Sequence, residues 1–395
     1  MQNRTFVYIS RWDEFTGEPG IAAFAFDPEQ GTLERLGIDE PVLTAGSACL
    51  SADRRVLYVA NEIKSNPDRR SGGGGLVWAF RIDPEIGALT CLSRVESCCP
   101  CPTYLSLDPT GHYLVCANHS SFFSVTRATR RADGTWGAEV VYDDATVDLF
   151  RLDDDGGIGP LVDVAKHRTV VDSFMLHSHP HCAVWSPQGD CFACCDKGDD
   201  HIYFYRIDPG AERLVLLGEP QQDTPGSAPR CCAFHPTAPW LFVNHERRTT
   251  VTSFRRGAQG ALKAVSEADC LPEDTPAHPT GRPAPGERPA QQALVMAPDG
   301  RTLYSVLNGK GVDGIAVFAV DEATGALRRM QFVHAEGVWA RGAALSPDGR
   351  FFVLTCLDGG GPVTVYRVGA DGTLSDARIE AHIPGGAHVT FVKPG

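Results

Sequence analysis

A run of histidines in this 395-residue sequence has residue types and spacing that could do chemistry. It reads His177-Ser178-His179-Pro180-His181, and alternate residues of a strand share one face, where imidazoles can bind a metal ion. Pro180 distorts the strand, and no carboxylate lies close in the sequence to complete a two-histidine, one-carboxylate site. We therefore expect no metal site in this segment.

The fourteen cysteines offer a second kind of chemistry. Cys98-Cys99-Pro100-Cys101 has the most ligand-like spacing, but no second Cys or His pair follows at the interval of a zinc finger or zinc ribbon. Neighbours such as Cys194 and Cys195 point to opposite faces of a strand, where cysteine acts as a small core hydrophobe. The sequence predicts buried structural cysteines, no metal and no cofactor.

Two further segments have only part of a binding motif. The acidic stretch from Asp196 to Asp200 falls short of the EF-hand pattern and is typical of a turn. Gly73-Gly74-Gly75 lacks the Gly-Lys-Ser/Thr ending of a phosphate-binding loop, and no helical pattern follows it. Neither segment predicts a cation or nucleotide site.

Composition and charge narrow the class of partner. The formal net charge is −13, which disfavours sequence-independent binding of nucleic acid, because such binding depends on basic surfaces. The sequence contains no apolar run of about eighteen residues, so it predicts no membrane span. Residues 1–6 lack the pattern of a signal peptide, so we expect a cytoplasmic protein in reducing surroundings whose partner is a small molecule.

An internal repeat shows which elements position these residues. One unit recurs six times, and each copy contains short apolar runs around a turn of the Ser/Asp/His-Pro-x-Gly kind. Pro187 and Pro236 in this turn are 49 residues apart, as are Pro298 and Pro347. The sequence thus consists of similar units of about fifty residues each.

Each unit contains four predicted strands. The third run alternates, as in Ile202–Asp208 and Ile315–Asp321, with the period of two that is typical of a strand. A Gly-Ala-Leu or Gly-Thr-Leu turn then leads to a fourth run, for example at Gly325 and Gly372. Four strands per unit with almost no helical periodicity predict an all-β protein, a β-propeller.

The two ends of the chain supply one more unit. The last apolar run, Ala387–Val392, has no partners after it, while Thr5–Ser10 and Ile21–Phe26 have no first strand before them. Joining them makes a seventh blade and removes a free sheet edge. We predict a single seven-bladed domain over residues 1–395, closed by strands from both termini.

Two stretches interrupt the period. Residues 128–177 contain runs such as Val147–Leu152, which we interpret as an extended outer strand with a long surface loop. Residues 270–291 are rich in Pro and Gly and without periodicity, which predicts a loop over one mouth of the ring.

Four segments carry a resemblance to a known family: Tyr58–Glu62, His179–Pro187, Ala228–Pro236 and Val243–Glu246. Through their order and spacing, and over essentially the whole chain, the sequence resembles the seven-bladed lactonases of the bacterial cytoplasmic 6-phosphogluconolactonase type, which are related to the fungal carboxy-muconate lactonizing enzyme. The resemblance implies a hydrolase of carbohydrate metabolism that opens a lactone, with or without a phosphate group, and does so without a metal.

The resemblance also implies the site residues. The family's His, Arg and Glu match His181, Arg230 and Glu246, which become the predicted catalytic residues. A fourth position, normally an Arg in an Asn-Arg-Gly loop, aligns with Asn308. The missing cation would come from Lys310, Arg288 or Arg341, and these three, with His179 and Asn308, are the predicted substrate-binding residues.

Opening a lactone requires a base that activates water and a donor for the carbonyl oxygen as it becomes an oxyanion. His181 or Glu246 can be the base, and Arg230 can be the donor. A phosphorylated substrate would need further cations, for which the candidates are Arg230, Arg247, Arg248 and Lys310.

Three alternatives stay open at this point. The same residues could close a lactone ring, as in a cycloisomerase, or the propeller could be a non-catalytic binding module. Each residue also has a structural interpretation. His181 could be a buried core histidine, Arg230 could donate hydrogen bonds to loop carbonyls, and Glu246 could form a solvated ion pair. A binding module should have an apolar, aromatic mouth, whereas a lactonase should bring His, Arg and Glu together.

Overall fold

A computed structural model describes residues 4–12, 20–39, 43–66, 68, 72–168, 177–273, 275, 289–309 and 311–393. Within these ranges the chain forms strands and one 3₁₀ turn, Ala258–Gly260. No helix among the described residues has the length and apolar character needed to cross a bilayer.

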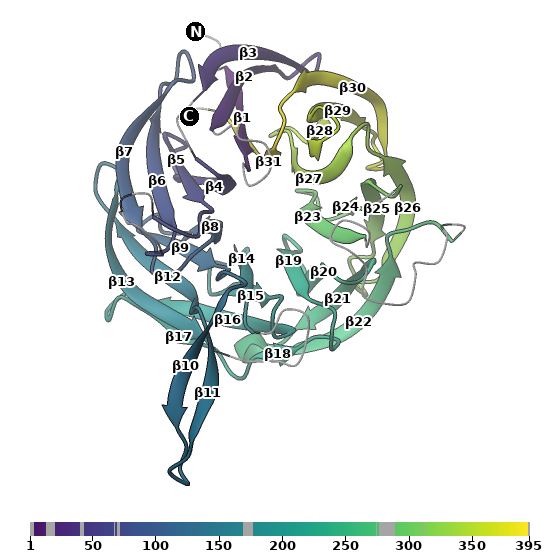
Figure 1. Cartoon of the computed structure of the whole chain (residues 1–395). Coiled ribbons are helices and arrows are strands. Elements are labelled where there is room, and N and C mark those ends of the chain that lie inside the picture. The colour runs from purple at the N-terminus through teal and green to yellow at the C-terminus, as the bar shows by residue number, and fades with distance from the viewer. Residues whose placement is uncertain are drawn as a thin grey trace.

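Seven sheets surround a central axis, and one edge strand of each sheet lies nearest the axis (Figure 1). We number them as blades 1 to 7 and give the strands of each from the axis outward. Blade 1 contains β31 (Gly386–Val392), β1 (Thr5–Arg11), β2 (Ile21–Asp27) and β3 (Thr32–Asp39). Blade 2 contains β4 (Ala45–Leu50), β5 (Val56–Asn61), β6 (Leu76–Ile82) and β7 (Leu89–Glu96). Blade 3 contains β8 (Pro102–Leu107), β9 (Tyr113–Asn118), β12 (Ala145–Leu152) and β13 (Ile158–His167).

The remaining blades follow in chain order. Blade 4 contains β14 (Pro180–Trp185), β15 (Phe192–Asp196), β16 (His201–Asp208) and β17 (Arg213–Leu216), with β18 (Gln221–Gln222) also paired to β16. Blade 5 contains β19 (Pro229–Phe234), β20 (Trp240–His245), β21 (Thr250–Arg256) and β22 (Leu262–Asp269). Blade 6 contains β23 (Ala290–Met296), β24 (Thr302–Asn308), β25 (Gly314–Val320) and β26 (Leu327–His334). Blade 7 contains β27 (Val338–Leu345), β28 (Phe351–Asp358), β29 (Pro362–Val368) and β30 (Leu374–His382).

Blade 1 joins the two ends of the chain. β31 pairs antiparallel with β1, from Phe6 opposite Val392 to Ser10 opposite His388, and the two strands belong to one blade in Figure 1. The predicted seven-bladed propeller with a blade built from both ends is confirmed.

The core lies between neighbouring blades. Leu57 and Val59 of β5 belong to a cluster with blade 1, whereas Tyr58 and Ala60 of the same strand belong to a cluster with blade 3. A strand that is buried on both faces reads as a continuous apolar run, which explains why all residues of β5 are buried. Seven such clusters, one per blade interface, surround the axis.

Tyrosines of the second strands join one blade to the next. The hydroxyl of Tyr304 donates a hydrogen bond to the carbonyl of Gly372 in blade 7 at 2.8 Å, and Tyr8 bonds Gly87 in the same way at 2.8 Å. The backbone of Gly372 has φ +83°, and a Cβ there would lie 2.1 Å from Thr302. The Gly-x-Leu turn seen in the sequence is therefore the docking point between blades.

One expectation about the insertions was wrong. β12, which contains Val147–Leu152, pairs with β9 and is the third strand of blade 3, so the outer strand is β13. Part of the extra chain forms a two-stranded hairpin, β10 (Ser124–Arg130) with β11 (Trp136–Tyr142), that projects from the ring (Figure 1). Residues 169–176 of this insertion lie outside the described residues. In the second insertion, residues 274 and 276–288 lie outside the described part of the chain.

We predict that Tyr304→Phe lowers the free energy of unfolding by about 1–3 kcal/mol, because the buried Gly372 carbonyl loses its donor. Chemical denaturation measures the change. Tyr113→Phe is the matched control, since its hydroxyl makes only a 3.4 Å bond to Glu212 at a partly buried position. Equal losses in both variants would contradict the importance of the Tyr304 bond.

Candidate active site

Irregular pairing at the start of the inner strands positions one set of polar side chains. In blade 4 Pro180 pairs with Asp196 and Cys182 with Cys195, so His181 is the extra residue of a β-bulge. Arg230 occupies the same position in blade 5, and Arg341 lies in the irregular stretch of blade 7 between Ala340 and Ala343. Because a bulge redirects a side chain, these three leave the packed faces of their blades.

The residue that follows the second strand supplies a second set. Glu246 follows β20 and Lys197 follows β15, while Glu62 and His119 follow β5 and β9. Second strands run antiparallel to the inner strands and end where these begin. Both sets therefore lie at the same end of the ring.

Glu246 joins blades 4 and 5 at this end. The ammonium group of Lys197 donates a hydrogen bond to Glu246 Oε2 at 2.7 Å, and Arg230 Nε lies 3.3 Å from the same oxygen. The exposed fraction of the side chain is 22% for Glu246, 7% for Lys197 and 8% for Arg230. The structure does not support the alternative interpretation of Glu246 as a solvated ion pair, because Glu246 belongs to a nearly buried group of three charges.

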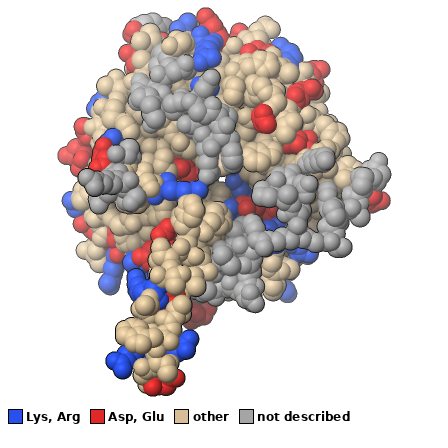
Figure 2. Space-filling model, viewed as in Figure 1, with Lys and Arg blue, Asp and Glu red and all other residues tan. Residues whose placement is uncertain are grey.

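Two more blades and a loop contribute a second ion pair. Arg341 Nη2 lies 3.9 Å from Glu62 Oε2, and the guanidinium lies over the Trp12 ring at 4.5 Å from its centroid. The His119 ring lies 5.7 Å from the ring of His181 between centroids. Figure 2 shows basic side chains near the middle of this face of the molecule. We name His181, Arg230, Glu246, Lys197, Arg341, Glu62 and His119 the axial cluster.

Buried polar side chains hold the cluster in place. The side-chain oxygen of Asn244, Oδ1, accepts a hydrogen bond from the Cys231 backbone N–H at 2.9 Å. The side-chain Nδ2 of Asn244 donates to the backbone carbonyl of Gln292 at 3.0 Å, and the two bonds fix the bulge at Arg230. Asp196 accepts from the Gly198 backbone N–H at 3.0 Å and lies 2.7 Å from His167 Nδ1. These two contacts of Asp196 fix the turn that positions Lys197.

Burial and the surrounding positive charges disfavour protonation of His181. Burial, together with the positive charges of Arg230, Lys197 and Arg341, holds the pKa of His181 well below its usual range. No described residue forms a hydrogen bond with His181 Nδ1. The imidazole is neutral at physiological pH and able to accept a proton.

The acidic and basic partners keep their charges. Burial opposes ionisation of Glu246, but Lys197, Arg230 and Arg341 outweigh it and lower the pKa of this carboxyl. Burial lowers the pKa of Lys197, and Glu246 opposes that effect. Burial and Arg341 lower the pKa of His388, on β31, to about 4. The site is thus positively charged around neutral imidazoles.

The predicted site residues fall into three groups. His181, Arg230, Glu246 and Arg341 come together in the axial cluster. His179 is fully buried, with its ring stacked 4.5 Å from that of His119, so it supports His119 and is not accessible to a substrate. Asn308 ends β24 opposite Ala290 and makes no hydrogen bond or ion pair with the cluster among the described residues. Lys310 and Arg288 lie outside the described residues.

Lys197, Glu62 and His119 were missed by the sequence analysis. Lys197 was interpreted only as part of an acidic turn, although it follows Asp196 at the position where Glu246 follows His245. Comparing this position across the repeats would have found all three residues.

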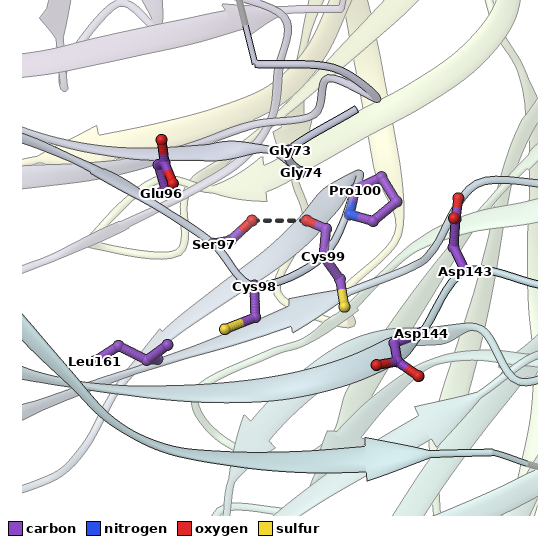
Figure 3. A pocket seen from close by; sticks show the side chains of 10 residues that line it. All are labelled: Gly73, Gly74, Glu96, Ser97, Cys98, Cys99, Pro100, Asp143, Asp144 and Leu161. Carbon is purple, nitrogen blue, oxygen red and sulfur yellow. Dashed lines mark hydrogen bonds between the residues drawn. The ribbon is translucent and has the colours of Figure 1, made fainter. Parts of the chain in front are cut away.

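A separate cavity of about 530 Å³ lies between blades 2 and 3 (Figure 3). Its acidic lining includes Glu96, Asp143 and Asp144, and it shares no residue with the axial cluster. Negative charges there disfavour an anionic lactone or its carboxylate product, so the axial cluster is the better candidate site.

Comparisons with known proteins agree with this architecture. Residues 6–391 match the family described as "Lactonase, 7-bladed beta-propeller". The chain is 26% identical to a 6-phosphogluconolactonase of Bacillus subtilis (strain 168) over 365 residues, which are 91% of this chain and 90% of that protein. A 6-phosphogluconolactonase of Formosa agariphila is 21% identical over 85% of this chain and 84% of its own length.

Solved structures show the same fold. The periplasmic gluconolactonase of Pseudomonas aeruginosa superposes with a TM-score of 0.83 at 24% identity, over 99% of this chain and 100% of that one. A putative 6-phosphogluconolactonase from Bacteroides fragilis gives a TM-score of 0.80 at 23% identity, over 99% and 98% of the two chains.

We predict that His181 stays neutral at pH values well below about 6.5, the ordinary histidine pKa, and that Lys197→Met moves its titration upward. The variant removes a positive neighbour that disfavours protonation. NMR of the imidazole nitrogens, assigned by loss of the signal in His181→Ala, measures both values. Lys166→Met is the control, since Lys166 pairs with Asp144 away from the cluster. Titration near 6.5 in the unmodified protein would contradict the proposed electrostatics.

Proposed function

Because the chain belongs to the family of seven-bladed β-propeller lactonases, and is a lactone hydrolase in that sense, we propose that the axial cluster opens 6-phosphogluconolactone or a closely similar sugar lactone. The proposal rests on His181, because burial and the nearby cations Arg230 and Lys197 hold its pKa well below its usual range. Ring opening needs a base next to positive charge. A mouth of His, Arg, Lys and Glu side chains also fits an enzyme better than an apolar docking surface.

In the proposed reaction, His181 accepts a proton from water as the water oxygen bonds to the lactone carbonyl carbon. The carbonyl oxygen becomes an oxyanion, which faces Arg230 and Lys197. In this nearly buried setting their charges stabilise it more than solvent would. Breakage of the ring C–O bond leaves an alkoxide, and the imidazolium of His181 returns the proton to it. The product is a hydroxy acid, which ionises in water.

The cations also change the strength of the base during the reaction. In the free enzyme they disfavour the imidazolium form of His181. A negative charge that develops on the substrate offsets them, so the pKa of His181 rises as the transition state forms. His181 can then hold the proton at the moment when it is needed.

We assign Glu246 an orienting role. Its carboxylate is already paired with Lys197 at 2.7 Å and lies 3.3 Å from Arg230, and its pKa is lowered, so it is a weak base. As the shared partner, it holds both cations toward the axis. A carboxylate that fixes the donors in advance reduces the reorganisation needed in the transition state.

Arg341 is the described cation best suited to a phosphate group. It belongs to blade 7, away from the pair formed by blades 4 and 5, and Trp12 and Glu62 fix its guanidinium. Arginine binds phosphate through a planar, two-pronged set of N–H donors. Arg248 is a poorer candidate because it pairs with Glu267 at a partly exposed position.

The cytoplasmic location that the sequence led us to expect stays a prediction.

We predict that His181→Ala lowers kcat/KM for 6-phosphogluconolactone by about 10²-fold or more, the usual contribution of a general base. Glu246→Gln should lower kcat/KM by about 10-fold or more, because Lys197 and Arg230 lose their common partner. The rate of ring opening above spontaneous hydrolysis measures both effects, and His334→Ala at an exposed position is the control. If the protein instead closes a lactone ring on carboxy-muconate and does not open 6-phosphogluconolactone, the hydrolase assignment is wrong and the protein is a cycloisomerase.

We predict that Arg341→Met raises KM for 6-phosphogluconolactone by about 10-fold, the value of one charge-assisted hydrogen bond, with little effect on unphosphorylated gluconolactone. Steady-state kinetics on both lactones separates binding of the phosphate from the chemical step. An equal rise in KM for the two lactones would show that Arg341 does not contact phosphate.

A further inference from the structure

Three cysteine thiols from two blades meet in the core behind the strands of the axial cluster. Cys182 and Cys195 belong to blade 4 and Cys232 to blade 5, and their sulfur atoms all lie within 4.8 Å of one another. The Sγ atoms of Cys182 and Cys232 are 3.8 Å apart. The three residues are 0%, 0% and 4% exposed for Cys182, Cys195 and Cys232.

This spacing suits three sulfur ligands of one metal ion. Three sulfurs that each lie about 2.3 Å from a central ion in a plane are about 4.0 Å apart. The observed sulfurs therefore need only a small contraction and no change of strand pairing. We propose that Cys182, Cys195 and Cys232 bind a single Cu(I) ion with three thiolate ligands, a site that goes beyond the proposed lactonase function.

The surroundings favour Cu(I) over zinc. Zinc in a structural site takes four ligands, and no fourth His, Cys, Asp or Glu joins this group in the described part of the chain. The core around the thiols is apolar and includes Ile202, Phe204 and Val243. Soft thiolates select Cu(I), and a singly charged ion does not require the missing ligand.

The proton and charge balance of binding is simple. Each of the three thiols loses its proton to solvent as its sulfur bonds to the ion, and copper stays in the +1 state, so no electron is transferred. The product carries a charge of −2. The guanidinium of Arg230 donates a hydrogen bond through Nη1 to the sulfur of Cys231, the residue before Cys232, at 3.6 Å. That positive charge partly offsets the cost of burying the anionic site.

The hydrogen bonding of the free thiols agrees with this assignment. The Cys182 and Cys232 sulfur atoms lie 3.8 Å apart, within hydrogen-bond distance for two thiols, so either S–H group can donate to the other sulfur. A shared cation would replace the proton in this contact and would also bond to the sulfur of Cys195.

The site has a direct connection to the axial cluster. Cys182 follows His181, Cys232 lies two residues after Arg230, and Cys195 lies two residues before Lys197. A bound ion would therefore link the three strands that carry these groups and stabilise the folded state. It would not contact the substrate.

The test is an anaerobic Cu(I) titration of the full chain against a chromogenic Cu(I) chelator. Because Cys91 and Cys98 are exposed, all proteins carry Cys91→Ser and Cys98→Ser. We expect one ion per chain, and at least 100-fold weaker binding in Cys195→Ala. Cys194→Ala is the matched control, since Cys194 is an equally buried neighbour on β15 that faces blade 3, and it should bind as tightly as the parent.

X-ray absorption of the copper-loaded parent protein provides a second, variant-independent result. Three sulfur neighbours and no nitrogen or oxygen neighbour are expected, even if Cys195→Ala fails to fold. No retained copper, unchanged binding in a folded Cys195→Ala, nitrogen or oxygen ligands, or preferential binding of zinc would each overturn the proposal. None of these measurements uses lactone hydrolysis, so the outcome is independent of the proposed function.

Discussion

Closure of the ring by the pairing of β31 with β1 is the constraint on which the molecule depends. The pairing runs from Phe6 opposite Val392 to Ser10 opposite His388, and it gives both faces of blade 1 a packed neighbour. An open array would expose two such faces and an unpaired edge. Only a closed ring brings the start of every inner strand to one axis, which is where the polar side chains of five blades meet.

The residues of the axial cluster occupy two positions in a blade that do not take part in core packing. A bulge at the start of the inner strand and the first residue after the second strand both escape the apolar interface between blades. Seven blades thus offer a small set of positions that can change without loss of core. In this chain those positions carry an excess of positive charge around neutral imidazoles, the distribution that stabilises a developing oxyanion.

The fold could be predicted from the sequence because each blade repeats the same apolar runs and turns, and repetition survives when individual residues vary. His181, Arg230 and Glu246 could be assigned only through a family resemblance, since nothing local distinguishes them from core or surface residues. The pairing of Lys197 with Glu246 could not be predicted from the sequence, and neither could the cluster of Cys182, Cys195 and Cys232, because each joins side chains of two blades. Val147–Leu152 was wrongly predicted to be an outer strand, since alternation alone does not tell which strand a run pairs with.

A crystal structure of the protein with the product 6-phosphogluconate tests whether ring closure creates one reaction centre on the axis. We expect the product carboxylate within hydrogen-bond distance of Arg230 and Lys197, beside the His181 ring, with the sugar chain directed across the axis toward blade 7. Product bound in the acidic cavity of Figure 3, or on the outer surface with the axial cluster unchanged, would contradict it.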